Sequence, residues 1–427
     1  MKRKLVIGIG IPVLIVILFI AFVTAYLYVD TPAFKDEPVP EIGNEIGAIN
    51  SSIDGQIQEL FDDSGIPSME VGILVGDELV WARGYGEQPD LSTVYMIGSI
   101  DKPIITTAIL QLVEEGLVSL DDDINEYLPF SVRHPDYPDK PVTIQMLLTH
   151  TSGLPHDVPG TYYVYRNNGP MVRWLLKHQF RLSILFGQYF FPPTDESTAR
   201  AFSAENADFW LSEPGTRYQY SNTAFYTLLV GMIEEVTGQS YYECIQENTI
   251  EALNMENTSF EISDYPKEQI AIPYEDFGEG RENDLPITGM AASGKIRTNV
   301  IDLSQFLLVH MNEGSLGDVQ ILKPESVELM HGPIISLSID NFPPSYLDGE
   351  GLSWFHFGDD SQGHGGNVAG YSADMLYKEG DETPYGIVIL MNYGVSKTPV
   401  VWEWWEEYYV GIRELLFEEA EAIAMGQ

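Results

Sequence analysis

The stretch Ile97-Gly98-Ser99-Ile100-Asp101-Lys102 joins a strand-like run to a helix. After it, apolar residues recur three and four positions apart from Pro103 to Gly116, which predicts a buried helix with a left-handed glycine at its end. Ser99 therefore lies at a helix N-terminus, where free N–H groups and the helix dipole favour an anion. Lys102 lies one turn further on, on the same face as the Ser99 hydroxyl. If that face is desolvated, Lys102 can shift toward its neutral form and take a proton.

Ser-x-x-Lys by itself does not define an enzyme. The motif occurs once in this sequence, close to what chance gives. It is also typical of a serine N-cap followed by a solvent-facing lysine. The two interpretations must be decided by the rest of the chain.

The composition describes a very acidic globular protein. With 427 residues, 44% of them hydrophobic, the chain can form one large or two ordinary domains with a packed core. A formal net charge of −42 argues against a nucleic-acid partner and indicates a strongly solvated surface. The single cysteine, Cys244, excludes an internal disulfide, and no Cys/His cluster indicates a metal or cofactor.

The N-terminus has the order expected of a membrane anchor. Three basic residues at 2–4 precede an uncharged run, Leu5–Val29, about 37 Å long as a helix and therefore long enough to span a bilayer. We expect residues 1–30 to be a single-pass anchor in the cell membrane, with the rest of the chain on the extracytoplasmic side. Residues 31–40 form a proline-stiffened linker. A cleaved signal peptide is the alternative, because Val23-Thr24-Ala25 resembles a processing site.

The periodicities place strands near both chain ends and helices between them. The expected helices are Glu41–Asp63, Met146–Leu148, Thr223–Thr237, a segment from about Asn299 to Leu308, and Trp402–Ala424. The expected strands are a hairpin over Ser68–Gly84, then Leu352–Phe357, Ser372–Tyr377 and Tyr385–Met391. This order predicts an α/β (α+β) domain over 41–427. Its antiparallel sheet comes from both chain ends, is flanked by helices and carries a helical subdomain within about 120–350.

The segment Gly160–Glu213 is rich in aromatic and basic residues. A plain helical subdomain is its simplest interpretation, and a lid over a substrate cleft or a membrane-facing flap are the alternatives.

Two further motifs follow Ser99 in chain order. Tyr220-Ser221-Asn222 comes after a Pro-Gly turn and opens a helix, whereas His364-Gly365-Gly366 heads a glycine cluster before a strand. Glycines there allow a substrate backbone to approach closely. His150 and Ser152 suggest a hydrolase dyad, but a structural histidine tied into its turn is the simpler interpretation.

Together the three motifs resemble the class C branch of the β-lactamase and penicillin-binding protein family, which includes D-alanyl-D-alanine carboxypeptidases and serine esterases. The resemblance runs from about Ser68 to Asn392. It implies a β-lactamase/transpeptidase-like fold and an acyl-enzyme formed on a small-molecule or peptide acyl substrate, with no cofactor or metal. A catalytically silent, membrane-tethered binding protein of the same fold is the alternative.

The resemblance also implies a role for each motif residue. The implied catalytic residues are Ser99 as nucleophile, Lys102 as the group that helps to deprotonate it, and Tyr220 as general base. The implied substrate-binding residues are Asn222, His364, Gly366 and Asn367, with the N–H groups of Ser99 and Asn367 forming an oxyanion hole. His364 stands where β-lactamases carry lysine, which shifts the expected activity toward an esterase or peptidase.

Overall fold

The computed structural model describes residues 34–156, 210–275, 281–282, 295–336, 347–368, 370–394 and 405–426. Within these ranges, no helix combines the length and the apolar character needed to cross a membrane. The expected anchor at 1–30 lies outside the described residues, as does most of the segment 160–213. Both interpretations therefore stay predictions.

One antiparallel sheet forms the centre of the described part. Its strand order is β1-β3-β2-β15-β14-β13-β12-β11-β10. Their bounds, in that order, are Glu45–Gly47, Glu78–Gly86, Ser68–Val75, Tyr385–Met391, Tyr371–Lys378, Gln362–Val368, Phe355–Phe357, Leu347–Glu350 and Ile335–Ser336. At the centre β2 pairs with β15, in a register that sets Met69 opposite Met391 and Val75 opposite Tyr385. The prediction of an antiparallel sheet made from both chain ends is confirmed.

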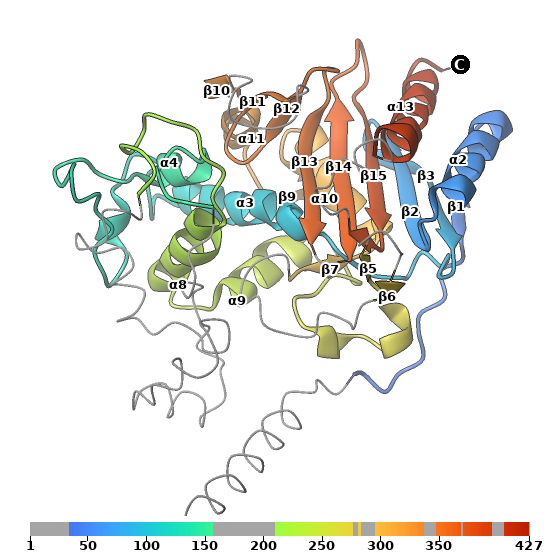
Figure 1. The fold of residues 1–427 in the computed structure, drawn as a ribbon, viewed down its shortest axis with the longest axis horizontal. Helices are drawn as coiled ribbons and strands as arrows, with labels where there is room; N and C mark the ends of the chain where they lie inside the picture. The colour runs from blue at the N-terminus through green and yellow to red at the C-terminus, as the bar shows by residue number, and fades with distance from the viewer. Residues whose placement is uncertain are drawn as a thin grey trace, which may run out of the picture.

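Helices cover both faces of this sheet. On one face α2 (Ser51–Ser64) and α13 (Gly411–Ala424) lie side by side, so that elements from the two ends of the chain meet (Figure 1). The other face carries α10 (Val300–Met311) and, beyond it, α3 (Asp101–Glu114). Alternate residues of β15 explain the two layers, because Ile387 packs toward α2 and α13 whereas Val388 belongs to the larger core around α3 and α10.

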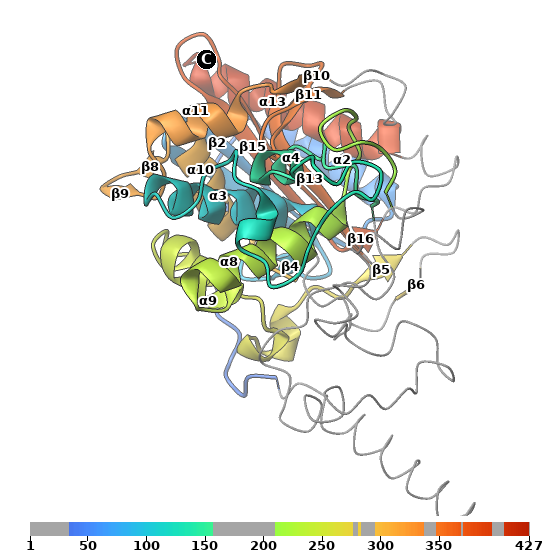
Figure 2. The same ribbon diagram turned by 90° about the vertical axis from the view of Figure 1, so that its left-hand side faces the viewer.

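Shorter elements complete a helical region beside the sheet, where α4, α8 and α9 lie near α3 (Figure 2). The remaining helices are α4 (Ile144–Leu148), α8 (Val230–Thr237), α9 (Tyr241–Ile245), α11 (Pro324–His331), the π-helices η5 (Ala224–Leu229), η6 (Gln246–Ile250) and η9 (Trp405–Val410), and the 3₁₀ turns η1 (Gly98–Ile100), η2 (Ile124–Glu126), η7 (Ile262–Asp264) and η8 (Lys267–Gln269). Small sheets join β4 (Tyr95–Met96) to β7 (Arg297–Thr298), β8 (Ser315–Leu316) to β9 (Val319–Gln320), and β16 (Tyr393–Gly394) to β5 (Tyr274–Glu275) and β6 (Arg281–Glu282).

Several local predictions hold and others are wrong. The hairpin and the strand Tyr385–Met391 are confirmed. The helix expected from about Asn299 is also confirmed, and the Asn299 side chain caps it by accepting a hydrogen bond from Asp302 N at 2.9 Å. The helix expected over Glu41–Asp63 is wrong in its first half. There Gly43 and Gly47 have φ of +99° and +75°, outside the helical region, and Asn50 caps a helix that starts only at Ser51.

The C-terminal strands also differ from the prediction. Only Phe355–Phe357 of the expected strand Leu352–Phe357 is extended, and Ser353, with φ of +57°, interrupts it. The glycine cluster at 363–366 precedes the strand β14, as expected, but it lies inside a strand that was not predicted, β13. Backbone ladder bonds to β14 hold this segment extended although its residues have low strand propensity.

Candidate active site

Ser99 lies at the turn between β4 and α3, against the backbone of β13. Gly98 adopts φ of +55°, which aims the turn toward the sheet edge, and a Cβ there would lie 2.8 Å from Asn367 N. A Cβ on Gly366 would lie 1.8 Å from the carbonyl oxygen of Ile97 and 3.0 Å from Ser99 N. The two backbones therefore approach as closely as glycine allows, and this contact brings the strand that carries Asn367 against the turn that carries Ser99.

Lys102 is fully buried beneath Ser99. Its Nζ donates to Ser99 Oγ at 3.0 Å and to the hydroxyl of Tyr226 at 3.1 Å. The ammonium also lies 4.8 Å from the ring centre of Tyr220 and 4.6 Å from that of Tyr226, so two aromatic faces surround it. The Ser99 and Lys102 side chains meet, as their one-turn spacing requires.

His150 holds the loop that carries Tyr220 in place through hydrogen bonds and ring packing. Its Nδ1 accepts a hydrogen bond from Ser221 N at 3.0 Å, its carbonyl accepts from Gln219 N at 2.6 Å, and its ring packs 4.3 Å from the Tyr220 ring. Burial, aided by the charge of Lys102, holds the pKa of His150 well below its usual value, so the ring is a neutral tether. The hydroxyl of Ser152 has no hydrogen-bond partner among the described residues, so the structural interpretation of His150 fits and the dyad does not.

His364 is buried on β13 with its ring 4.5 Å from that of Phe355. Its Nδ1 donates to the carbonyl of Gly365 at 2.6 Å, whereas Nε2 has no partner in the described part of the chain. Burial, together with the charge of Lys102, lowers the pKa of His364 to about 3. This side chain is therefore uncharged at neutral pH.

The other expected substrate-binding side chains are those of Asn222 and Asn367. Asn222 is partly exposed and its backbone N–H donates to the carbonyl of His156 at 2.9 Å. Asn367 is exposed, and its side-chain amide donates to Ser372 Oγ at 3.2 Å. Gly366 lies against the backbone of Ser99, and the Tyr220 ring lies 4.8 Å from Lys102 Nζ, so the structure brings the three sequence motifs together.

Three buried polar groups of this centre escaped the sequence analysis. Tyr226 donates a short hydrogen bond to Asp101 Oδ1. Glu350, at the end of β11, places Oε1 3.6 Å from His150 Nε2, and its pKa rises to about 8 because burial outweighs the hydrogen bond from Tyr218 and the charge of Lys102. Of these groups, only Tyr226 could have been noticed in the sequence. It places a hydroxyl within an apolar helical segment, and a buried hydroxyl needs a hydrogen-bond partner.

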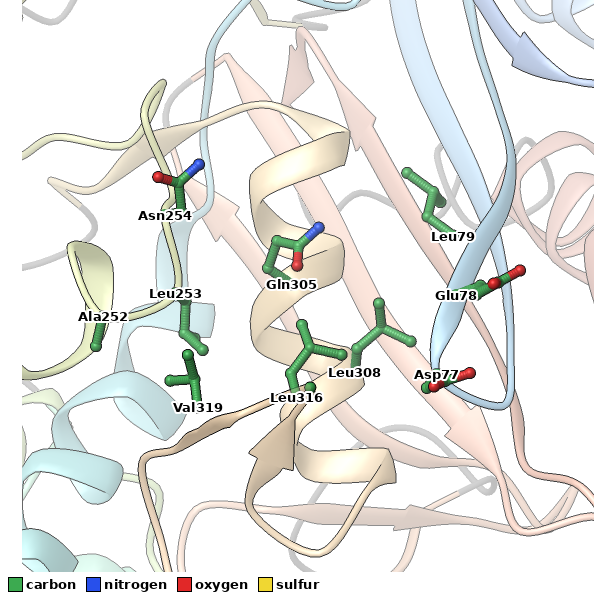
Figure 3. Close-up of a pocket in the computed structure, with 11 residues that line it drawn as sticks. Asp77, Glu78, Leu79, Ala252, Leu253, Asn254, Gln305, Leu308, Leu316 and Val319 are labelled. Atoms are coloured by element: carbon green, nitrogen blue, oxygen red, sulfur yellow. The ribbon is translucent and has the colours of Figure 1, made fainter.

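Other sites were sought in the described ranges. No group of three or more His, Cys, Asp or Glu side chains there is arranged to hold a metal ion. A surface cavity of about 610 Å³ lies between the β2–β3 turn, α10 and the β8–β9 hairpin, and Leu308, Leu316, Val319, Asp77 and Glu78 are among its lining residues (Figure 3). It contains none of the residues around Ser99.

Comparisons with known proteins identify the family of this chain. The family model described as beta-lactamase matches residues 53–405, so the chain belongs to the beta-lactamase family, a class of serine hydrolases. The chain is 28% identical to the D-alanyl-D-alanine-carboxypeptidase/endopeptidase AmpH of Escherichia coli, over 57% of each chain. It is 25% identical to Protein flp of Staphylococcus aureus, over 81% of this chain and 64% of that protein. The match thus spans less than two thirds of either relative.

Solved structures share the fold. The octameric penicillin-binding protein homologue from Pyrococcus abyssi matches with a TM-score of 0.64 and 24% identity, over 88% of this chain and 77% of that one. The D-amino acid amidase from Ochrobactrum anthropi matches with a TM-score of 0.63 and 20% identity, over 85% and 99%. At these identities the likeness establishes the β-lactamase-like fold alone.

Proposed function

We propose that this chain hydrolyses an ester or amide through an acyl-enzyme on Ser99. The observation that carries the proposal is the 3.0 Å contact between Ser99 Oγ and the fully buried Nζ of Lys102. A nucleophile and a proton acceptor within hydrogen-bond reach, at a helix start beside a glycine-rich edge, are what acyl transfer requires.

In the proposed first step Ser99 Oγ attacks the substrate carbonyl and its proton passes to the Lys102–Tyr220 pair. The C–O bond to Ser99 forms, and the negative charge on the carbonyl oxygen is stabilised by the N–H groups of Ser99 and Asn367. When the tetrahedral intermediate collapses, the amine or alcohol leaves with a proton returned by the same pair. Water then releases the acid by the reverse sequence, while Asn222 orients the acyl side.

The site favours substrates that do not rely on a carboxylate at the His364 position. His364 is neutral, with a pKa of about 3, so it offers no positive charge there. We therefore propose D-amino-acid amides, short peptides and simple esters over β-lactams. The proposal draws support from relatives and fold neighbours that are named as a D-alanyl-D-alanine carboxypeptidase/endopeptidase and a D-amino acid amidase.

A fluorophosphonate probe tests the nucleophile without a known substrate. We expect the wild-type domain to be labelled and peptide mass spectrometry to find the adduct on Ser99. Ser99→Ala should abolish labelling and leave the melting temperature nearly unchanged, because this hydroxyl is partly exposed.

The outcomes separate the alternatives. Labelling that persists in Ser99→Ala, or an adduct on Ser152 or Ser221, contradicts the assignment. A folded wild-type protein that is never labelled would instead be the catalytically silent binding protein.

We further propose that residues 1–30 anchor the domain on the extracytoplasmic side of the cell membrane, since a basic cluster precedes an uncharged run of bilayer length. Protease added to intact cells should then degrade the domain, and N-terminal sequencing of membrane-extracted protein should begin near Met1. A mature chain that begins at Tyr26 would show a cleaved signal peptide in place of the anchor.

A further inference from the structure

Two side chains that the proposed reaction leaves without a role lie directly against Lys102. The hydroxyl of Tyr226 accepts a hydrogen bond from Lys102 Nζ at 3.1 Å. The same hydroxyl donates a short hydrogen bond to Oδ1 of Asp101, the residue that precedes Lys102 at the start of α3. Tyr226 and Lys102 are inaccessible to solvent, and Asp101 is 3% exposed. The three side chains form one buried chain of hydrogen bonds that ends at Ser99.

We propose that Asp101 and Tyr226 are positioning residues that fix Lys102 as the proton acceptor for Ser99. The inference rests on the proposed function, because it concerns how Lys102 serves the nucleophile. Its basis is the single proton of the Tyr226 hydroxyl. That proton is committed to Asp101, so Tyr226 presents only lone pairs to Lys102, and Lys102 must direct an N–H toward it.

This commitment determines where the lone pair of a neutral Lys102 points. One N–H is directed to Tyr226, and Ser99 Oγ lies 3.0 Å from the same nitrogen, within reach of its lone pair. Without Asp101 the Tyr226 hydroxyl could rotate and donate its own proton to Lys102. It would then compete with Ser99 for the lone pair. Asp101 thus excludes an unproductive arrangement of the same three side chains.

The local backbone gives an independent indication. Tyr226 lies in η5, a π-helix, and short π-helical segments occur often at functional sites. Its i→i+5 bonding places Tyr226 rather than a neighbour at Lys102, while Phe225 keeps its ring centre 5.8 Å from the same nitrogen. The π-helical segment therefore positions two consecutive aromatic side chains around one ammonium.

The surrounding charges make the effect measurable as a pH dependence. Within the part of the chain that the structure describes, the titratable groups that face these side chains include Tyr220, His150, His364 and Glu350 around Lys102, and Tyr241 beside Asp101. Burial keeps the two histidines neutral near pH 7, and Glu350 holds its proton below about pH 8. A negative charge on Asp101 opposes deprotonation of both Lys102 and Tyr220. Its removal should therefore move the acid limb of the reaction to lower pH.

The rate of fluorophosphonate labelling reports this step directly. In that reaction the Ser99 Oγ–P bond forms, the P–F bond breaks, fluoride leaves and the serine proton passes to the base. The rate constant is measured from pH 5 to 9 on the whole protein and normalised to the folded fraction. We expect Tyr226→Phe to slow labelling by about ten- to a hundredfold, the effect of losing one hydrogen bond to a charged group. Asp101→Asn, which keeps the shape and removes the charge, should move the acid limb to lower pH.

A matched control separates positioning from stability. Tyr265 is also buried, and its hydroxyl donates to the carbonyl of Arg297 at 3.0 Å, away from Lys102. Tyr265→Phe should lower the melting temperature without changing the labelling rate per folded molecule or its pH profile.

Wild-type rates and an unchanged acid limb in both site variants would overturn the inference. If Tyr226→Phe fails to fold, the near-isosteric Asp101→Asn decides alone. A wild-type protein that is not labelled at Ser99 overturns the proposed function and this inference with it, so the two failures are distinguishable.

Discussion

Replacing Lys102 by methionine should slow labelling of Ser99 by at least about 10²-fold, the contribution typical of a positioned acid–base group. Methionine is unbranched and of similar length, so the pocket between the Tyr220 and Tyr226 rings stays filled. The ammonium is fully buried, and its removal also relieves a desolvation cost. Its removal also takes a positive charge away from the buried Asp101, so the melting temperature should fall, and the large loss of rate is measured per folded molecule.

The control is a lysine whose charge has no part in the site. Lys140 pairs with Glu213 at 2.9 Å, and both side chains are about one-third exposed. Lys140→Met should leave the labelling rate unchanged. A Lys102→Met protein that folds and labels within threefold of wild type would show that another group deprotonates Ser99.

Gly366→Ala should strongly slow labelling of Ser99, because the added methyl group has no room. The new Cβ would lie 1.8 Å from the carbonyl oxygen of Ile97 and 3.0 Å from Ser99 N, and both are backbone atoms that cannot turn aside. β13 must then withdraw from the nucleophile's turn, which separates the two N–H groups of the proposed oxyanion hole. Loss of one such donor typically costs about 10²–10³ in rate.

The neighbouring glycine provides the comparison. A Cβ on Gly365 would point to the other face of β13 and meet Asp374 Oδ1 at 2.6 Å, which is a side-chain atom. Gly365→Ala should therefore lower the melting temperature but retain most of the labelling rate. Equal rates for the two variants, measured per folded molecule, would contradict the role given to the close approach at Gly366.

Local patterns predicted the parts of the site that depend on short spacings. The one-turn separation of Ser99 and Lys102 requires their contact, and the continuous apolar run at Tyr385–Met391 predicts a fully buried strand. The prediction of a helix over residues 41–50 is wrong although the apolar periodicity there is real, because Gly43 and Gly47 adopt backbone angles outside the helical region.

The remaining partners of Lys102 depend on geometry that no helical wheel contains. Tyr226 reaches it through a π-helix, whose i→i+5 bonds shift the register set by 3.6 residues per turn. Glu350 lies on a strand almost 250 positions further along the chain, and only the order of the strands in the sheet determines which residues lie next to it. Sequence spacing carries no information about such long-range neighbours.

The pairing of β2 with β15 has a consequence for folding during synthesis of the protein. Ser68 N donates to Asn392 Oδ1, 324 positions later, so at roughly 5–20 residues per second the ribosome needs about 15–65 s to supply the partner of β2. Throughout that interval α2 can cover one face of β2, but the strand edge that pairs with β15 has no partner, and nascent chains should need a holding chaperone. The edge that faces Ser99 is also made late, because β13 starts only at Gln362. We therefore expect nascent chains not to react with a fluorophosphonate probe at Ser99 until translation is nearly finished.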